Sequence, residues 1–296
     1  MKKKSILVVI VLIISSIGCQ AQNEKKEANF SELTGTYFNE AFPSSTVSRF
    51  APNVFTQELH APPIFSPDGT EVYWSWMGKE HRNIRYMKLI DGIWTQPASV
   101  PFGFTEGSDS PFISSDGTKL VFLWGHFSGA AGPGKVCIVE KSNGEWMSPK
   151  ILGNEVNQNG AHWQASIADN QNLYFATKKD IYFSEYVNGK YTTAEKLGTT
   201  INTENVIEST PFIAPDESYL IFDRSSPLYA DLFISFKQTD GSWGDAINMV
   251  ELNTNLHELY ANVSPDGRFI MFMSNRSGIS LPYWVDASII ENYRPD

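Results

Sequence analysis

The stretch that decides the fold is residues 64–74, IFSPDGTEVYW, in which an Asp-Gly turn separates two runs of apolar and aromatic residues. Such a pair between two such runs is a strong short-range signal for a β-hairpin. Similar segments recur at 112–122 (FISSDGTKLVF), 166–175 (SIADNQNLYF), 212–222 (FIAPDESYLIF) and 262–272 (NVSPDGRFIMF). The turn residues Asp68, Asp116, Asn170, Asp216 and Asp266 are spaced by 48, 54, 46 and 50 residues. This regular spacing indicates a repeat architecture.

A second turn follows within most repeats, at Asp91-Gly92, Asn143-Gly144, Asn188-Gly189 and Asp240-Gly241. Two hairpins per repeat make four strands, and four-stranded repeats without helices are typical of β-propeller blades. The sequence therefore predicts an all-β propeller of five four-stranded antiparallel blades, or six if residues 30–48 add strands. The fifth repeat lacks the second turn. We expect the N-terminal stretch 49–55 to supply its outer strand, so that both termini close one blade.

The first 19 residues have the three parts of an export signal: Lys2-Lys3-Lys4, an uninterrupted apolar run at 6–14, and Gly18-Cys19. The apolar run is too short to span a membrane. Gly18-Cys19 resembles the lipobox of bacterial lipoproteins, and the resemblance implies a leader at 1–18 that is cut off and an acylated Cys19. Residues 19–48 are then the lipidated cysteine and a polar tether, and 49–296 the propeller domain. We expect a lipid-anchored protein of the cell envelope, at the periplasmic or surface face of the outer membrane, that touches the membrane through this lipid only.

The Ser-Pro-Asp-Gly units resemble the WD40-like repeats of TolB-type propeller proteins, over about 80% of the chain. The resemblance is specific for the fold and weak for function, since that family includes binding modules, peptidase domains and polysaccharide lyases. The chain carries 23 Lys and Arg against 33 Asp and Glu, a net charge of −10, and three of these lysines lie in the leader. So acidic a chain is a poor candidate for binding nucleic acid. We expect a monomer.

Aligning the repeats predicts a ring of side chains where the inner strands begin, near the propeller axis. Its first position holds His60, Ser108, His162, Glu208 and Glu258. Its second position includes Asp109 and Trp163, and its third includes Tyr260. The following strands would add Trp76, His126, Asp223, Arg224 and Arg276 on the same face. His60, His162, Glu208 and Glu258 could ligate a divalent metal, or the two histidines could act in proton transfer.

Two functions fit this face, and a water-filled channel would fit it as well. The first is an envelope-anchored binding module for a glycan or an envelope protein, because aromatic and Arg side chains in a funnel suit sugars, acidic ones above all. The alternative is a metal-assisted lyase or hydrolase of an acidic polysaccharide, with His60 or His162 as the base. Cys137 lies in a predicted strand and is expected to be inert core.

Overall fold

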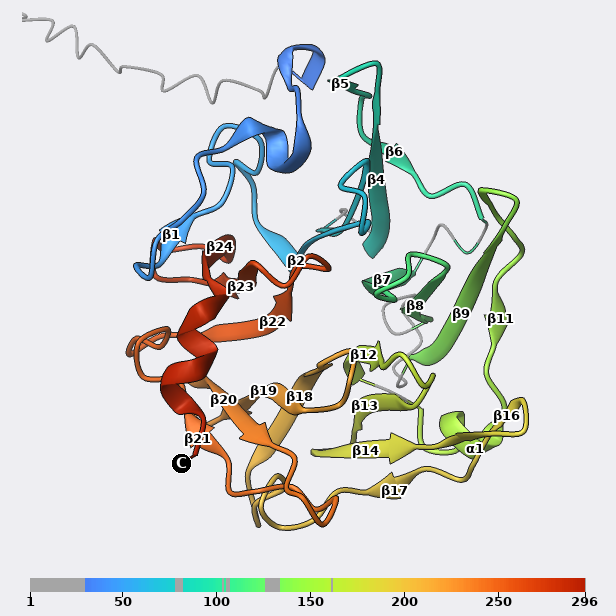
Figure 1. Cartoon of the computed structure of the whole chain (residues 1–296), viewed down its shortest axis with the longest axis vertical. Coiled ribbons are helices and arrows are strands. Elements are labelled where there is room, and N and C mark those ends of the chain that lie inside the picture. The colour runs from blue at the N-terminus through green and yellow to red at the C-terminus, as the bar shows by residue number, and fades with distance from the viewer. Residues whose placement is uncertain are drawn as a thin grey trace, which may run out of the picture.

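The computed structural model describes residues 30–77, 82–102, 104, 107–125, 134–160 and 162–295. Five antiparallel sheets stand around a central axis, in chain order around the ring (Figure 1). The predicted five-bladed propeller is therefore confirmed. No helix in these residues is long and apolar enough to cross a bilayer.

Each blade begins with its inner strand at the axis and adds strands outward. Blade 1 is β2 (Leu59–Phe65), β3 (Glu71–Met77) and β4 (Arg82–Ile90), with β5 (Ile93–Trp94) and β6 (Ala98–Ser99) both pairing with β4. Blade 2 is β7 (Ser108–Ile113), β8 (Lys119–Trp124) and β9 (Lys135–Ser142), with β10 (Glu145–Trp146) and β11 (Lys150–Ile151) on β9. Blade 3 is β12 (His162–Ile167), β13 (Leu173–Thr177), β14 (Asp180–Ser184) and β17 (Glu195–Lys196), with the small hairpin β15 (Tyr186–Val187) and β16 (Lys190–Tyr191) beside it. Blade 4 is β18 (Ile207–Ile213), β19 (Tyr219–Ser225), β20 (Ala230–Phe236) and β21 (Ile247–Asn248). The outer strands are short, and in blades 1 and 2 they are split into two pieces.

Blade 5 joins the two ends of the described chain, as predicted. Its strands β22 (Glu258–Val263), β23 (Phe269–Ser274) and β24 (Leu281–Asp286) come from the C-terminal part, and its outer strand is β1 (Ser48–Arg49). The segment before β1 holds the 3-10 turns η1 (Phe30–Glu32) and η2 (Thr36–Asn39) and adds no sixth blade. Instead it buries Tyr37 and Phe38 among aromatic rings of blades 1 and 5.

The turn residues behave as their chemistry predicts. Ser66 donates to Asp68, Ser114 to Asp116 and Ser264 to Asp266, so these aspartates hold the hairpin turns. At the second turns, Asp91-Gly92, Asn143-Gly144 and Asn188-Gly189 have positive φ at both residues, as type I′ hairpins require. Cys137 is fully buried, and burial raises the pKa of its thiol to about 12. The expectation of inert core is therefore consistent with its surroundings.

An asparagine that follows an apolar residue locks each of three blade junctions. Asn157 ends the short helix α1 (Asn154–Asn157), and Asn202 and Asn253 take its place in the next two connections. Each side chain accepts from and donates to the backbone of the third strand of the preceding blade, at Val136, Ile181 or Leu232. The last element, η3 (Ala287–Tyr293), is capped by Asp286 and packs its apolar side chains into the core.

Candidate functional site

Every inner strand is irregular at the same height. The pairing with the second strand shifts between Ala61 and Ile64 in blade 1, and at the equivalent place in the other four blades. These are β-bulges, which re-aim side chains and are common next to active sites. In blades 2–5 the bulge holds a non-glycine residue at positive φ: Ser110, Trp163, Thr210 and Tyr260. Because the bulge recurs, it belongs to the fold, and the side chains it carries decide what each blade offers to the axis.

A cavity of about 550 Å³ opens on the face where the inner strands begin. Its wall is mostly apolar, from side chains such as Leu59, Met77, Ile207, Leu259 and Ile279. Its polar lining includes Glu58, His60, Arg82, Ser209, Thr210, His257, Tyr260 and Asn275. A largely apolar cavity with a few convergent polar groups is the usual form of a small-molecule site.

His60 is the centre of a polar cluster in this cavity. Its Nδ1 lies 2.9 Å from Oδ2 and 3.0 Å from Oδ1 of Asp109. Arg82 Nη1 lies 2.6 Å from His60 Nε2 and donates to Asp109 Oδ2 over 3.1 Å. The hydroxyl of Tyr260 lies 2.8 Å from His60 Nε2. Asp109 therefore orients an imidazole whose other nitrogen faces Arg82 and Tyr260.

The two buried members of the cluster differ in protonation. Burial alone would raise the pKa of Asp109, but its contacts with His60 and Arg82 hold that pKa below its ordinary value. Burial, together with the Asp109 carboxylate, raises the pKa of Tyr260 well above the usual range. The cluster at neutral pH therefore contains a carboxylate and a neutral phenol, which can donate a hydrogen bond.

Trp163 forms the aromatic part of the site. Its ring centroid lies 6.2 Å from that of His60, and the residue keeps 37% of its surface exposed although it lines the cavity. Its φ of 72° is an unusual conformation for so bulky a residue. Blade 3 thus presents a broad apolar ring to the cavity from a strained position of the backbone.

A second carboxyl group lies buried beside the cavity floor. Asp223 accepts from the hydroxyls of Ser209 and Thr210, and Thr210 in turn accepts from the backbone N–H of Tyr260. Burial raises the pKa of Asp223 to about 6, and the hydroxyl donors offset only part of that rise. Asp223 has no cationic partner in the described residues, in contrast to Asp109.

Glu208 and Glu258, expected in the ring, are engaged within their own blades. Arg224 Nε donates to Glu208 Oε1 over 3.0 Å, and Arg276 Nη2 to Glu258 Oε1 over 3.2 Å. Each glutamate also accepts from the backbone N–H and the hydroxyl of a threonine in the preceding loop, Thr203 or Thr254. Both carboxylates are fully buried and neither lines the cavity. The two arginines also donate to backbone carbonyls in the preceding loops. Each Glu–Arg pair therefore ties the first two strands of its blade to the loop before them, and we call these two pairs the closing pairs.

The other predicted site residues lie in several places. Trp76 lines a separate groove on the side of blade 1. His162 begins β12, but its side chain, like the whole of His126 and Cys19, lies outside the described residues. Within the described part of the chain, no three His, Cys, Asp or Glu side chains gather as a metal site would require.

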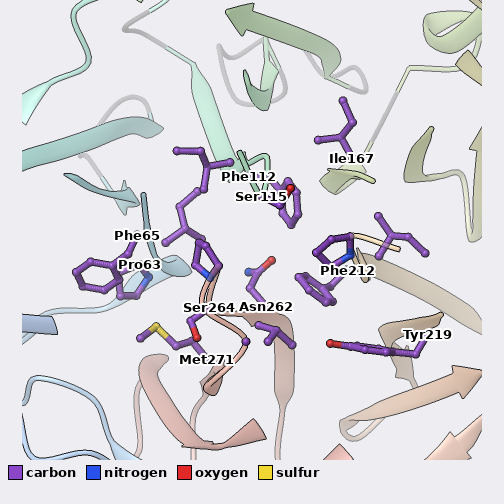
Figure 2. A pocket seen from close by; sticks show the side chains of 17 residues that line it. Pro63, Phe65, Phe112, Ser115, Ile167, Phe212, Tyr219, Asn262, Ser264 and Met271 are labelled. Carbon is purple, nitrogen blue, oxygen red and sulfur yellow. The ribbon is translucent and has the colours of Figure 1, made fainter. Parts of the chain in front are cut away.

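The axis has a second, smaller hollow toward the opposite face. It measures about 100 Å³ and carries no charged side chain among its lining residues. Figure 2 shows Phe112, Phe212, Ile167 and Asn262 around it. Gln164 donates to the backbone oxygen of Pro211 and to Asn262 Oδ1. These bonds join the inner strands of blades 3, 4 and 5, and Asn262 also lines the smaller hollow.

Sequence reasoning missed Arg82 as a site residue and gave Tyr260 no role. Arg82 begins the third strand of blade 1, not an inner strand, and its guanidinium lies against His60 in the cavity. Tyr260 was placed in the ring by alignment, but its contact with His60 spans blades 5 and 1. The pattern Asn-Thr before Glu208 and Glu258, with an arginine 16 or 18 residues after each glutamate, was a signal for their structural role.

Similar solved structures confirm the propeller fold and carry no information on function. The chain is similar to TolB from Acinetobacter baumannii, with a TM-score of 0.52 and 14% identity over 76% of this chain and 51% of that one. It is similar to a putative TolB from Agrobacterium tumefaciens, with a TM-score of 0.52 and 17% identity over 74% of this chain and 71% of that one. The chain thus spans about half the length of the first of these proteins. No protein-family model matches it, and no curated protein matches it in sequence.

Proposed function

We propose that the protein is a lipid-anchored envelope propeller that binds a glycan in its axial cavity. The observation that carries the proposal is Trp163, an exposed aromatic residue in a strained backbone position beside His60, in the cavity that Arg82 also lines. The ring offers an apolar face to the C–H side of a sugar, while His60, Arg82 and Tyr260 offer hydrogen-bonding groups to its hydroxyls and acidic groups. A propeller fold shared with TolB is consistent with a binding module.

The test is a glycan array on the soluble form that begins at Gln20, followed by melting curves with the glycans that bind. A ligand that binds only the folded state stabilises it by ~2.7 kcal/mol at a hundredfold excess over its dissociation constant. Trp163→Ala should abolish most of this stabilisation. Tyr229→Ala is the matched control, because Tyr229 is 39% exposed and does not line the cavity. An array with no hits, or equal loss in both variants, would contradict the proposal and favour an envelope protein as the partner.

The lipid anchor is tested separately. Cys19 follows the small residue of a lipobox-like leader, and no other anchor is proposed for the chain. Cys19→Ser should therefore release the protein from membranes into the soluble fraction. If the variant still sediments with membranes after a high-salt wash, the lipoprotein assignment is wrong.

A second function is favoured by the His60 cluster: a lyase or hydrolase of an acidic polysaccharide. An imidazole held by a carboxylate on one nitrogen and facing Arg82 and Tyr260 with the other is suited to proton transfer. Incubation of acidic polysaccharides with the protein, with and without divalent metal ions, should then give an unsaturated or newly reducing product. His60→Ala must abolish that product if the activity belongs to this site.

A further inference from the structure

A groove on the side of blade 1 borders the axial cavity and has the composition of a second binding surface. It has a volume of about 480 Å³ and lies between β3, β4 and the loop that leads into β2. Its lining residues are Phe30, Val54, Phe55, Thr56, Gln57, Leu59, Trp74, Trp76, Arg85, Gln96 and Pro97. They combine aromatic rings with amide and guanidinium donors, as in a site that binds polar rings.

The groove has a net positive lining in an acidic protein. Arg85 lies over the ring of Trp76, with its Cζ 4.9 Å from the ring centroid, and both side chains are half-buried. None of the lining residues is acidic, although the chain carries a net charge of −10. A guanidinium that stacks on an aromatic plane and faces no carboxylate in its groove suits a planar anion such as a carboxylate.

The groove and the axial cavity meet at one cross-strand pair. Leu59 lines both hollows, and its partner across the β2–β3 ladder is Trp76. Consecutive residues of a strand point to opposite faces, and here Trp76 lines the groove while Met77 lines the axial cavity. The two hollows are therefore neighbours on either side of the buried Leu59, and a chain-like ligand that occupied both would pass over the start of β2.

We propose that the lateral groove is an extension of the axial site, and that the two together hold one acidic oligosaccharide. This inference rests on the proposed glycan-binding function and adds to it a substrate class and a length requirement. Trp163, His60 and Arg82 hold one end of the ligand. Arg85, stacked on Trp76, pairs with a carboxylate of a sugar further along, and the amides of Gln57 and Gln96 bind hydroxyls there.

Calorimetric titration with a ladder of oligogalacturonates of increasing length tests the proposal. The wild-type protein should bind the longer members about tenfold more tightly than the shortest, the gain expected from one charge-assisted contact. Arg85→Gln should remove this gain and leave the affinity for the shortest binding member unchanged. Trp76→Ala should do the same, and Arg85→Gln decides the matter if loss of the tryptophan impairs folding.

Two further variants separate the outcomes. Trp163→Ala should weaken the binding of all lengths, because it belongs to the axial part. Arg268 lies in the β22–β23 turn on the opposite face, where its guanidinium stacks on Phe42. Arg268→Gln should leave the affinity for every length unchanged. If wild-type affinity does not depend on length, or the gain survives in both groove variants, the extension is wrong and the axial proposal stands. If no member of the ladder binds, both the extension and an acidic glycan as ligand are wrong.

Discussion

Blades 4 and 5 use the start of the inner strand for stability, whereas blade 1 uses it for the cavity. Glu208 pairs across the ladder with Arg224, and Glu258 with Ser274. In blade 1 the same register is taken by Leu59, opposite Trp76, because a second bulge displaces His60. One extra residue thus turns a closing position into a side chain that reaches the axis. Equivalent positions in a repeat protein can therefore serve different purposes, and the pairing register tells them apart.

The largest expected effect is on the closing pairs. Glu258→Ala leaves Arg276 without its carboxylate and Thr254 and Ser274 without their acceptor. Breaking a buried pair by removing one partner costs about 3–5 kcal/mol, and urea denaturation should show a loss of this size. Glu291→Gln is the control, since its pair with Arg294 is exposed to solvent and contributes little to stability. Similar losses in the two variants would show that the blade 5 pair is not structural.

An effect of intermediate size is expected on the pH dependence of stability, and it comes from Asp223. This carboxyl group of blade 4 has hydroxyl partners in place of an arginine. Its folded pKa of about 6 lies above the unfolded value of ~3.9. Between these values the folded state binds more protons than the unfolded state, so stability falls as pH rises through this window. Asp223→Asn should remove that fall, an effect of about 2–3 kcal/mol between pH 4 and 7.

The measurement is the urea midpoint of wild type and Asp223→Asn at several pH values. Asp216→Asn serves as the control, because the pKa of this exposed turn carboxyl is lowered and its contribution has the opposite sign. If the wild type and Asp223→Asn show the same pH profile from 4 to 7, Asp223 is ionised in the folded protein at the same pH as in the unfolded chain.

The smallest effect on stability is expected at His60, the residue that the second bulge of blade 1 displaces toward the axis. Removing its ring leaves Asp109 paired with Arg82, so His60→Ala should cost only about 1–2 kcal/mol. It should nevertheless abolish the stabilisation by a bound glycan, the reverse of what Glu258→Ala does. Melting curves with and without the oligogalacturonate ladder check this. A His60→Ala protein that melts as early as Glu258→Ala would mean that His60 also closes its blade.

The fold could be predicted because its signals are local: Ser-Pro-Asp-Gly turns hold their own backbone, and their spacing counts the blades. The site could be predicted only in part, because it depends on register. The residues around His60 carry no sequence signal for a second bulge. Arg82 reaches the cavity from the third strand of its blade, which an alignment of inner strands leaves out. The roles of Glu208 and Glu258 depend on arginines that fold back across the ladder, which a linear alignment of ring positions does not consider.

The closing blade has a consequence for how the chain can acquire its structure. Residues 48 and 49 pair with residues 283 and 284, which are made more than 200 residues later. Two ladder pairs alone would poorly offset the entropy of closing so long a loop. The closure therefore depends on the packing of Phe50 against Trp284, with ring centroids 4.8 Å apart, and on Tyr37 beside them. During synthesis, blades 1 to 4 can form in turn, while the aromatic contacts of blade 5 cannot be completed until β24 has been made.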